Sequence, residues 1–382
     1  MTAPRTNSIT YLDHAASTPM RPEAIEAMLP YLADSYANPS GSHRFARQAR
    51  RAIDEARDVV AAVVGCRPGE VVFTGCGTES DNMAVSGAVS RRGGVAVCSA
   101  AEHHAVLHPV EHHGGVVVGV DDAGSIDLEA LGRVLDETDH VSIVSVMAVN
   151  NEVGTITDVV EASRIVRRHA PDALVHTDAV QGACWLDLRE ITPHVDLLSL
   201  SAHKFGGPKG VGVLIERGGP KVDALIMGGG QERERRSGTQ NTAGIVATAV
   251  ALQLIDAERD SEAIRIAELR DRLVKELQSR LDGVVETVPS SRKVAGAAHV
   301  CISGVESEAL LFLLDEADVC ASAASACASG AMEPSHVLRA MGVDRSVAMG
   351  ALRLSLGHTT TETDIDRATD VIVAAVNQLR RR

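Results

Sequence analysis

One lysine of the chain is placed where it could hold a carbonyl cofactor. Lys204 ends the run Ser201-Ala-His-Lys204, which follows an apolar stretch typical of a buried strand and precedes a glycine-rich turn. A lysine amine beside a hydroxyl and an imidazole is suited to forming a Schiff base with such a cofactor. A lone lysine of this kind can equally be a surface residue of a hairpin, so its interpretation depends on the other polar residues.

Two short segments have the composition of anion sites. Gly75-Cys-Gly-Thr78 joins a predicted strand to a predicted helix, where small residues let backbone N–H groups face a phosphate and Thr78 adds a hydroxyl. Glycines at such a turn can also be purely structural. Arg235-Arg-Ser-Gly-Thr239 combines basic side chains with hydroxyls and suits a phosphate or a carboxylate, or else forms a solvated loop.

A carboxylate also falls at a strand end. Asp178 precedes Lys204 by 204 − 178 = 26 residues, about one strand–helix–strand step in an alternating fold. A buried carboxylate needs a cationic partner, and a protonated pyridine nitrogen would be one. Alternatively, Asp178 caps the helix that follows. Gln181 lies just beyond it, and Asn151 follows the preceding predicted strand.

Histidines cluster after another predicted strand. His103 could stack on a flat cofactor ring, whereas His104, His108 and His112 have helical spacing that could surround a cation. Pro109 interrupts a helix across them, and no complete ligand set is present. We therefore predict a solvated histidine-rich segment and no metal site.

A thiol and an arginine complete the candidates. Ser322-Ala-Ala-Ser-Ala-Cys-Ala-Ser-Gly330 contains only small residues, so we expect a mobile loop that presents Cys327. Arg353 interrupts the apolar pattern Leu352-Arg-Leu-Ser-Leu356 and needs an anionic partner. That partner is either a substrate carboxylate or a structural Asp or Glu.

The elements that must position these residues alternate along the chain. Strands are predicted at 71–74, 95–99, 116–120, 141–146, 174–177, 195–200 and 211–215, and helices at 22–31, 44–64, 78–89, 128–135 and 159–169. This alternation predicts an α/β fold with a mainly parallel central sheet flanked by helices. Ligands of such sheets bind at the carboxyl ends of strands, where the polar residues above fall.

The pattern changes after Gly228-Gly-Gly230. Long helices are predicted at 242–256 and 261–281, followed by a smaller α+β unit. We therefore predict a large domain over residues 15–255, and a small α+β domain that combines residues 1–14 with 256–382 and carries the Cys327 loop.

The amino-acid composition argues against several classes of function. The 382 residues are 45% hydrophobic and 23% charged, with a formal net charge of −14. This charge argues against direct binding to nucleic acid or an anionic membrane. No apolar run approaches the roughly 20 residues of a membrane helix, and no signal peptide is evident. The seven cysteines form no C-x-x-C pair, which favours free thiols in the cytoplasm.

Together the motifs resemble the cysteine desulfurases of the NifS/IscS type, within the class V aminotransferase branch of the fold-type-I pyridoxal phosphate enzymes. The resemblance extends from Tyr11 to about Leu379. It rests on Tyr11-Leu-Asp13, Asn38-Pro-Ser40, Ser42-His-Arg44, Gly77-Thr-Glu-Ser-Asp-Asn82, Glu102-His103, Val149-Asn-Asn-Glu152, Asp178-Ala-Val-Gln181, Ser201-Ala-His-Lys204, Arg236-Ser-Gly-Thr239, Ser325-Ala-Cys327, Glu333-Pro-Ser335 and Arg353-Leu-Ser-Leu356.

The resemblance implies a role for each candidate. Lys204 would bind pyridoxal phosphate covalently, with Asp178 on the ring nitrogen and His103 stacked on the ring. The other cofactor contacts would come from Gly77, Thr78, Asn151, Gln181, Ser201 and His203, with Thr239 contributed by the neighbouring subunit. Arg353 and Asn151 would bind the substrate, and Cys327 would take its sulfur as a persulfide.

The same resemblance implies a reaction and partners. The expected enzyme is a homodimer that converts L-cysteine to L-alanine and passes the sulfur to a protein acceptor. An iron–sulfur scaffold, a tRNA thiolation enzyme and another sulfur pathway are all open as acceptors. Alternatives are a selenocysteine lyase, another class V enzyme, or a non-catalytic sulfur-relay subunit.

Overall fold

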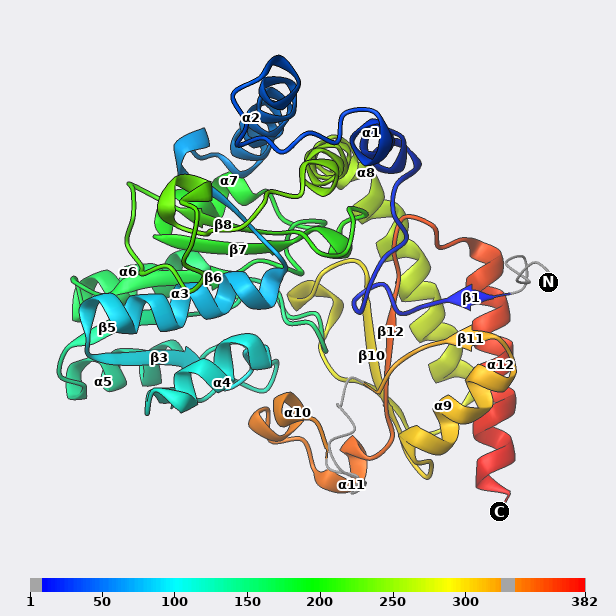
Figure 1. Ribbon diagram of the computed structural model, residues 1–382. Helices are drawn as coiled ribbons and strands as arrows, with labels where there is room; N and C mark the ends of the chain where they lie inside the picture. Colours follow the sequence, from blue (N-terminus) through cyan, green and yellow to red (C-terminus); the bar gives the residue numbers. More distant parts are fainter. Residues whose placement is uncertain (1–8, 324–333, 382) are drawn as a thin grey trace.

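A seven-stranded sheet forms the larger part of the molecule (Figure 1). The computed structural model describes residues 9–323 and 334–381. The strands lie in the order β2-β8-β7-β6-β5-β3-β4. Their bounds are β2 Val71–Thr74, β3 Val95–Ser99, β4 Val116–Val118, β5 Val141–Ser145, β6 Leu174–Asp178, β7 Leu197–Ser201 and β8 Gly212–Glu216.

The direction of the strands confirms the predicted sheet. The pairs from β7 through β6, β5 and β3 to β4 are parallel, and β8 is antiparallel to both β7 and β2. The short connection between β7 and β8 permits only the antiparallel arrangement, because a parallel return needs a long crossover. Every residue of β5, β6, β7 and β8 is buried, as expected for strands covered on both faces.

Helices cover both faces of this sheet. Met83 of α3 and Val106 of α4 pack against one face with Ile143, while Ile53 of α2 and Leu131 of α5 pack against the other with Val144. Adjacent residues of β5 thus point to opposite layers, as the pleat requires. The helices of this part are α1 Pro22–Ala33, α2 Arg44–Val64, α3 Gly77–Arg92, α4 His104–His112, α5 Leu128–Glu137, α6 Val159–His169 and α7 Leu188–Ile191.

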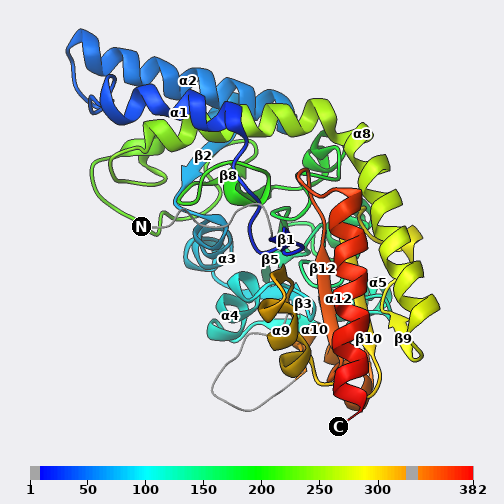
Figure 2. The same cartoon turned by 90° about the vertical axis from the view of Figure 1, so that its right-hand side faces the viewer.

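A single long helix replaces the two that the sequence predicts near residues 242–281. Helix α8 runs without a break from Thr242 to Arg280 and extends over both parts of the molecule (Figure 2). The segment 257–260, read as a break, is Ala-Glu-Arg-Asp, which contains no Gly or Pro, and Arg259 pairs with Asp256 at 2.8 Å. The helix packs into the sheet core up to Ile255 and into a second core from Ile266.

That second core belongs to a smaller α+β unit. Its antiparallel sheet has the order β12-β10-β9, and the N-terminal strand β1 pairs in parallel with β11. Leu12 is therefore buried with residues near the C-terminus. The elements are β1 Thr10–Tyr11, β9 Val284–Glu286, β10 Ala297–Ile302, β11 Val319–Cys320, β12 Ala351–Ser355, α9 Ser307–Glu316, α10 His336–Ala340, α11 Arg345–Ala348 and α12 Glu362–Arg380. The exact domain limits stay a prediction.

Helix α4 also departs from expectation, because it continues through Pro109. Proline cannot donate a hydrogen bond to the carbonyl of residue 105, which would otherwise be left without its helical partner. The side-chain amide of Asn82 donates to that carbonyl at 3.2 Å instead. The helix therefore tolerates the proline at this position. Within the described parts of the chain, no helix has both the length and the apolar composition of a membrane span.

Candidate active site

The predicted cofactor and substrate residues converge on one pocket at the carboxyl ends of β5, β6 and β7, beside the first turn of α3. Thr239 is an exception, and Cys327 lies outside the described residues. The pocket is lined by Ala15, Ala16, Cys76, Gly77, Thr78, Asp81, His103, Met147, Asn151, Asp178, Val180, Gln181, Ser201, His203, Lys204 and Arg353. Residues from both structural units therefore meet here, since Arg353 belongs to β12.

The start of α3 has the groups that an anion cradle in this pocket would need. Helix α3 has 16 residues and begins at Gly77, whose backbone N–H donates to the hydroxyl of Ser201 at 3.3 Å. A Cβ atom on Gly77 would lie 2.9 Å from Val180 and 3.1 Å from Ser201, so glycine is needed for this approach. Thr78 adds a hydroxyl at the same helix terminus, where the helix dipole favours an anion.

Lys204 lies at the end of a short turn after β7. Its Nζ donates hydrogen bonds to the carbonyls of Ala15 at 2.6 Å and Ala16 at 2.9 Å. Burial, with the nearby Arg353, lowers the pKa of Lys204 to about 8. A substantial fraction of the amine is therefore neutral at physiological pH, which suits a nucleophile or a base.

The surroundings of Asp178 fit both roles that the sequence allows, a local cap and a partner for a ring nitrogen. One carboxylate oxygen accepts the backbone N–H of Val180 at 2.8 Å, a local turn interaction. The carboxyl group is also 5% exposed, and burial raises its pKa to about 6. A cationic ring nitrogen would stabilise its charged form, so Asp178 fits a pyridine-type cofactor.

Two other buried carboxyl groups surround Asp178. Burial, together with the charge of Asp178, raises the pKa of Asp81 and of Glu102 well above the usual range. Burial therefore disfavours the charged form of both groups. One additional positive charge would stabilise the charged form of the carboxyl groups of Asp178, Asp81 and Glu102.

A neutral histidine lies beneath these acids. His176 is fully buried, which lowers its pKa to about 3. Its Nδ1 lies 2.8 Å from the hydroxyl of Ser145, and its Nε2 lies 3.0 Å from that of Ser199 and 3.6 Å from the Asp81 carboxyl. His176, Ser145 and Ser199 thus form a buried hydrogen-bonded network next to Asp81.

His103 stands at the wall of the pocket as the N-cap of α4. Its Nδ1 accepts the backbone N–H of Ala105 at 3.1 Å, so the ring carries its proton on Nε2. Partial burial and the charge of Lys204 lower the pKa of His103 to about 4. A neutral imidazole is therefore available to stack against a flat ring.

Arg353 pairs with a structural acid and also lines the pocket. Its Nη2 pairs with Asp13 at 2.7 Å, and its Nη1 donates to the carbonyl of Asn151 at 3.1 Å. Its Nε is buried without a hydrogen-bond partner among the described residues. Arg353 also lines the pocket, so a substrate carboxylate and Asp13 are compatible as its two anions.

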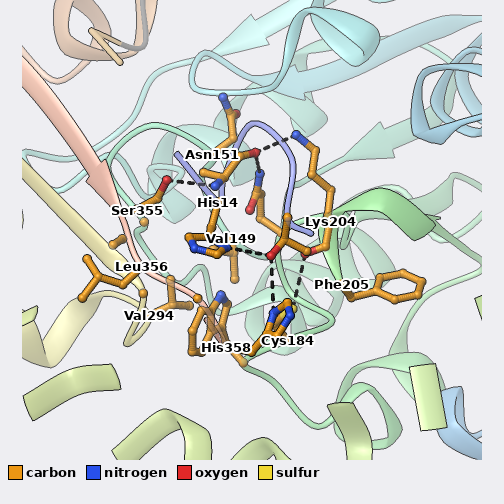
Figure 3. Close-up of a pocket in the computed structure, with 18 of the residues that line it drawn as sticks. His14, Val149, Asn151, Cys184, Lys204, Phe205, Val294, Ser355, Leu356 and His358 are labelled. Atoms are coloured by element: carbon orange, nitrogen blue, oxygen red, sulfur yellow. Dashed lines mark hydrogen bonds between the residues drawn. The ribbon is translucent and has the colours of Figure 1, made fainter. Parts of the chain in front are cut away.

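A second cavity lies behind Lys204, between the two units (Figure 3). Its volume is about 820 Å³, including space open to solvent, and it shares Asn151, Lys204 and Arg353 with the first pocket. Cys184 lines it and donates a weak hydrogen bond to the Lys204 carbonyl at 3.5 Å. Burial raises the pKa of Cys184 to about 12, so this thiol is not a nucleophile.

Comparison with known proteins decides the family. The model of "Aminotransferase class-V" matches residues 10–368. The chain is 41% identical over 378 residues to "Cysteine desulfurase IscS" of Dictyoglomus turgidum, covering 97% of this chain and 95% of that one. It is 43% identical over 386 residues to "IscS-like cysteine desulfurase" of Mycobacterium tuberculosis, covering 98% of each. A solved structure, "NIFS-LIKE PROTEIN", superposes with a TM-score of 0.90 at 35% identity, covering 97% and 100%.

The chain belongs to the class V aminotransferase family. Its relatives place it among the cysteine desulfurases of the NifS/IscS type, which confirms the resemblance inferred from the motifs. The fold of this class V aminotransferase is likewise the one predicted.

One residue predicted for the class V site, Thr239, lies elsewhere in this chain. Thr239 lines a separate cavity with Gly75 and Arg236, and Arg236 pairs with Glu79 at 2.8 Å. Its assignment to a neighbouring subunit stays a prediction. Cys327 lies outside the described residues, so its position relative to Lys204 is not part of this geometry.

Sequence reasoning missed an N-terminal contribution to the class V site. The turn at residues 13–18 provides Asp13 to Arg353, the Ala15 carbonyl to Gln181 at 2.7 Å, and the Ser17 hydroxyl to His203 at 3.3 Å. The only available signal was Asp13 within the motif at 11–13. The pairing partners lie far away in sequence, so periodicity could not reveal them.

The histidine-rich segment forms a small ring cluster in this family member. His104 stacks on His108 with centroids 4.7 Å apart and lies 4.4 Å from His336. Over residues 9–323 and 334–381, no three His, Cys, Asp or Glu side chains are grouped so that they could hold a metal ion.

Proposed function

We propose that the chain catalyses the conversion of L-cysteine to L-alanine with pyridoxal phosphate, and carries the sulfur as a persulfide on Cys327. The observation that carries this proposal is the convergence of Lys204, Asp178 and Arg353 on one pocket. An amine of lowered pKa, a buried carboxylate and a cation with a free donor are the groups that this chemistry needs.

The pocket residues suit the cofactor. Asp178 would bind the ring nitrogen, His103 would stack on the ring, and the N-terminus of α3 would bind the phosphate with other polar groups. Those groups are Gly77, Thr78, Ser201 and His203, while Gln181 and Asn151 would contact the ring substituents. When bound, pyridoxal phosphate supplies an acceptor for the electrons left by the substrate Cα–H bond.

The chain's own side chains then handle the substrate. Arg353 would bind the α-carboxylate, with Asn151 beside it, and Lys204 would remove the Cα proton with its neutral amine. The Cys327 thiolate would attack the substrate sulfur, so that an S–S bond forms while the Cβ–S bond breaks. The electron pair of the Cβ–S bond stays on Cβ. This carbon takes a proton and becomes the methyl group of L-alanine, which is then released.

Assembly and sulfur delivery belong to the same proposal. A homodimer would allow Thr239 of a second copy to complete the phosphate site, because Thr239 lies apart from the pocket of its own chain. The persulfide would pass to a protein acceptor in the cytoplasm. An iron–sulfur scaffold, a tRNA thiolation enzyme or another sulfur-using protein could fill that role.

One assay tests the proposal. Wild type, Cys327→Ala and the matched control Cys320→Ala are given L-cysteine and a thiol reductant, and cofactor absorption, alanine and sulfide are measured. We expect all three proteins to be yellow, with only Cys327→Ala inactive. A wild type that pyridoxal phosphate cannot make yellow would contradict the cofactor assignment. A Cys327→Ala variant that still produced alanine and sulfide would move the nucleophile elsewhere.

A further inference from the structure

The carboxylate of Asp13 is already paired with Arg353, the cation that we propose for binding the substrate. Asp13 Oδ1 lies 2.7 Å from Arg353 Nη2, and the arginine side chain is only 9% exposed. No role in the reaction has so far been given to this acid. Asp13 and Arg353 are 340 positions apart, so the pair connects the N-terminal turn to β12.

The backbone holds Asp13 firmly beside Arg353. Residue 13 forms a bridge with Ser355 of β12, and the backbone N–H of Ser355 donates to the Leu12 carbonyl at 2.8 Å. The Tyr11 hydroxyl donates to the Asp13 carbonyl at 3.1 Å. The carboxylate therefore stays within reach of the guanidinium whether or not an amino acid is bound.

Two anions must then share one cation. A substrate carboxylate that approaches Arg353 from the pocket comes close to the Asp13 carboxylate, and the two negative charges repel each other. Arginine has enough N–H donors for both groups, so the acid weakens binding without blocking it. Neutralising Asp13 would remove the repulsion but leave the oxygen that accepts from Arg353.

We propose that Asp13 opposes the α-carboxylate at Arg353, and thereby limits the affinity for amino acids and speeds the release of L-alanine. The inference rests on the proposed function, in which Arg353 binds the substrate carboxylate.

The turn that follows Asp13 also contacts Lys204. Ala15 and Ala16, two and three residues after Asp13, provide the carbonyls that accept from Lys204 Nζ. The acid beside Arg353 and the acceptors of the Lys204 amine are therefore held by one short segment of backbone.

The test compares two ligands that differ only in the carboxylate. L-Alanine and ethylamine are titrated into cofactor-loaded wild type and Asp13→Asn, and binding is followed by cofactor absorption. We expect Asp13→Asn to lower the Kd of L-alanine roughly three- to ten-fold and to leave that of ethylamine unchanged. Asp13→Ser, a second neutral variant, should act in the same direction.

Asp370→Asn is the matched control, because Asp370 pairs with Arg280 at 2.8 Å on the surface away from the pocket. It should alter neither Kd. An Asp13→Asn variant with an unchanged or raised Kd for L-alanine would overturn the inference and make Asp13 a purely structural partner. An equal change for both ligands would also overturn it. A wild type that binds L-alanine no better than ethylamine would overturn the proposed role of Arg353, and this inference with it.

Discussion

Lys204 Nζ lies 2.6 Å from the backbone carbonyl oxygen of Ala15, which is 189 positions earlier in the chain. The contact joins the carboxyl end of the central sheet to the turn that follows the N-terminal strand. The same carbonyl accepts the side-chain amide of Gln181. The lysine is therefore a partly buried, oriented amine, and not the surface residue of a hairpin that its sequence context also allowed.

Removing the Lys204 amine should abolish both covalent attachment of the cofactor and activity. Lys204→Ala is expected to lose about a thousand-fold or more in alanine formation, because no other lysine lines the pocket in the described chain. Borohydride reduction followed by peptide mass analysis should locate the cofactor on Lys204 in wild type. Lys209→Ala, at an exposed position nearby, is the control and should keep both properties. Label found on another lysine would refute the assignment.

Uptake of pyridoxal phosphate by the cofactor-free protein should depend on pH through Lys204. Its pKa is lowered to about 8, so the reactive neutral amine is scarce at pH 6 and dominates above pH 8. We expect the rate of covalent uptake to rise roughly ten-fold per pH unit below 8 and then level off. Stopped-flow absorption would measure it. A rate that kept rising beyond pH 10 would indicate an unperturbed lysine.

Asp178 should destabilise the cofactor-free protein at neutral pH. Its folded pKa is raised to about 6, so between pH 4 and 6 the folded protein holds a proton that the unfolded chain has lost. Stability therefore falls as pH rises through this window. Asp178→Asn should be more stable than wild type above pH 6 by about 1–3 kcal/mol in free energy of unfolding, with the difference vanishing below pH 4.

Denaturant titrations across pH would measure this effect, and Asp196 provides a control of opposite sign. Burial raises the pKa of Asp196, but hydrogen bonds from Val175 and Arg167 outweigh it and give a net lowering. Asp196→Asn should therefore be less stable than wild type at pH 7, with the gap closing as pH falls. If Asp178→Asn were also destabilised at pH 8, Asp178 would be a structural cap and not a strained site residue.

A methyl group at Gly77 should weaken phosphate binding. The added Cβ would come within 2.9 Å of Val180 and 3.1 Å of Ser201, at the point where α3 and β7 meet. Gly77→Ala is expected to raise the Kd of pyridoxal phosphate about ten-fold or more, measured by equilibrium dialysis. Gly119→Ala is the matched control, because nothing lies within 4 Å of its Cβ. Equal affinities in both variants would argue against the cradle.

The sheet was predictable because each buried strand carries its own local signal. β2, β3 and α6 have the bounds that periodicity predicted, and the polar residues at the ends of β5, β6 and β7 meet as expected. Parallel topology brings such ends together whatever the intervening sequence.

The failures have tertiary causes. The donor that lets α4 pass Pro109 comes from Asn82 on another helix. Asp13 reaches Arg353 only because β1 pairs beside β11, a contact between the two ends of the chain. The local sequence pattern does not show which distant residues will pair.

A single-turnover experiment shows whether Cys327 receives the substrate sulfur. Cofactor-loaded protein is mixed with one equivalent of L-cysteine without reductant, alanine is counted, and peptides are analysed by mass. We predict one alanine per site and the mass of one extra sulfur atom on the peptide that contains Cys327, in wild type and in Cys320→Ala alike. Alanine formed without added sulfur on Cys327, or sulfur found on Cys320 instead, would contradict the account.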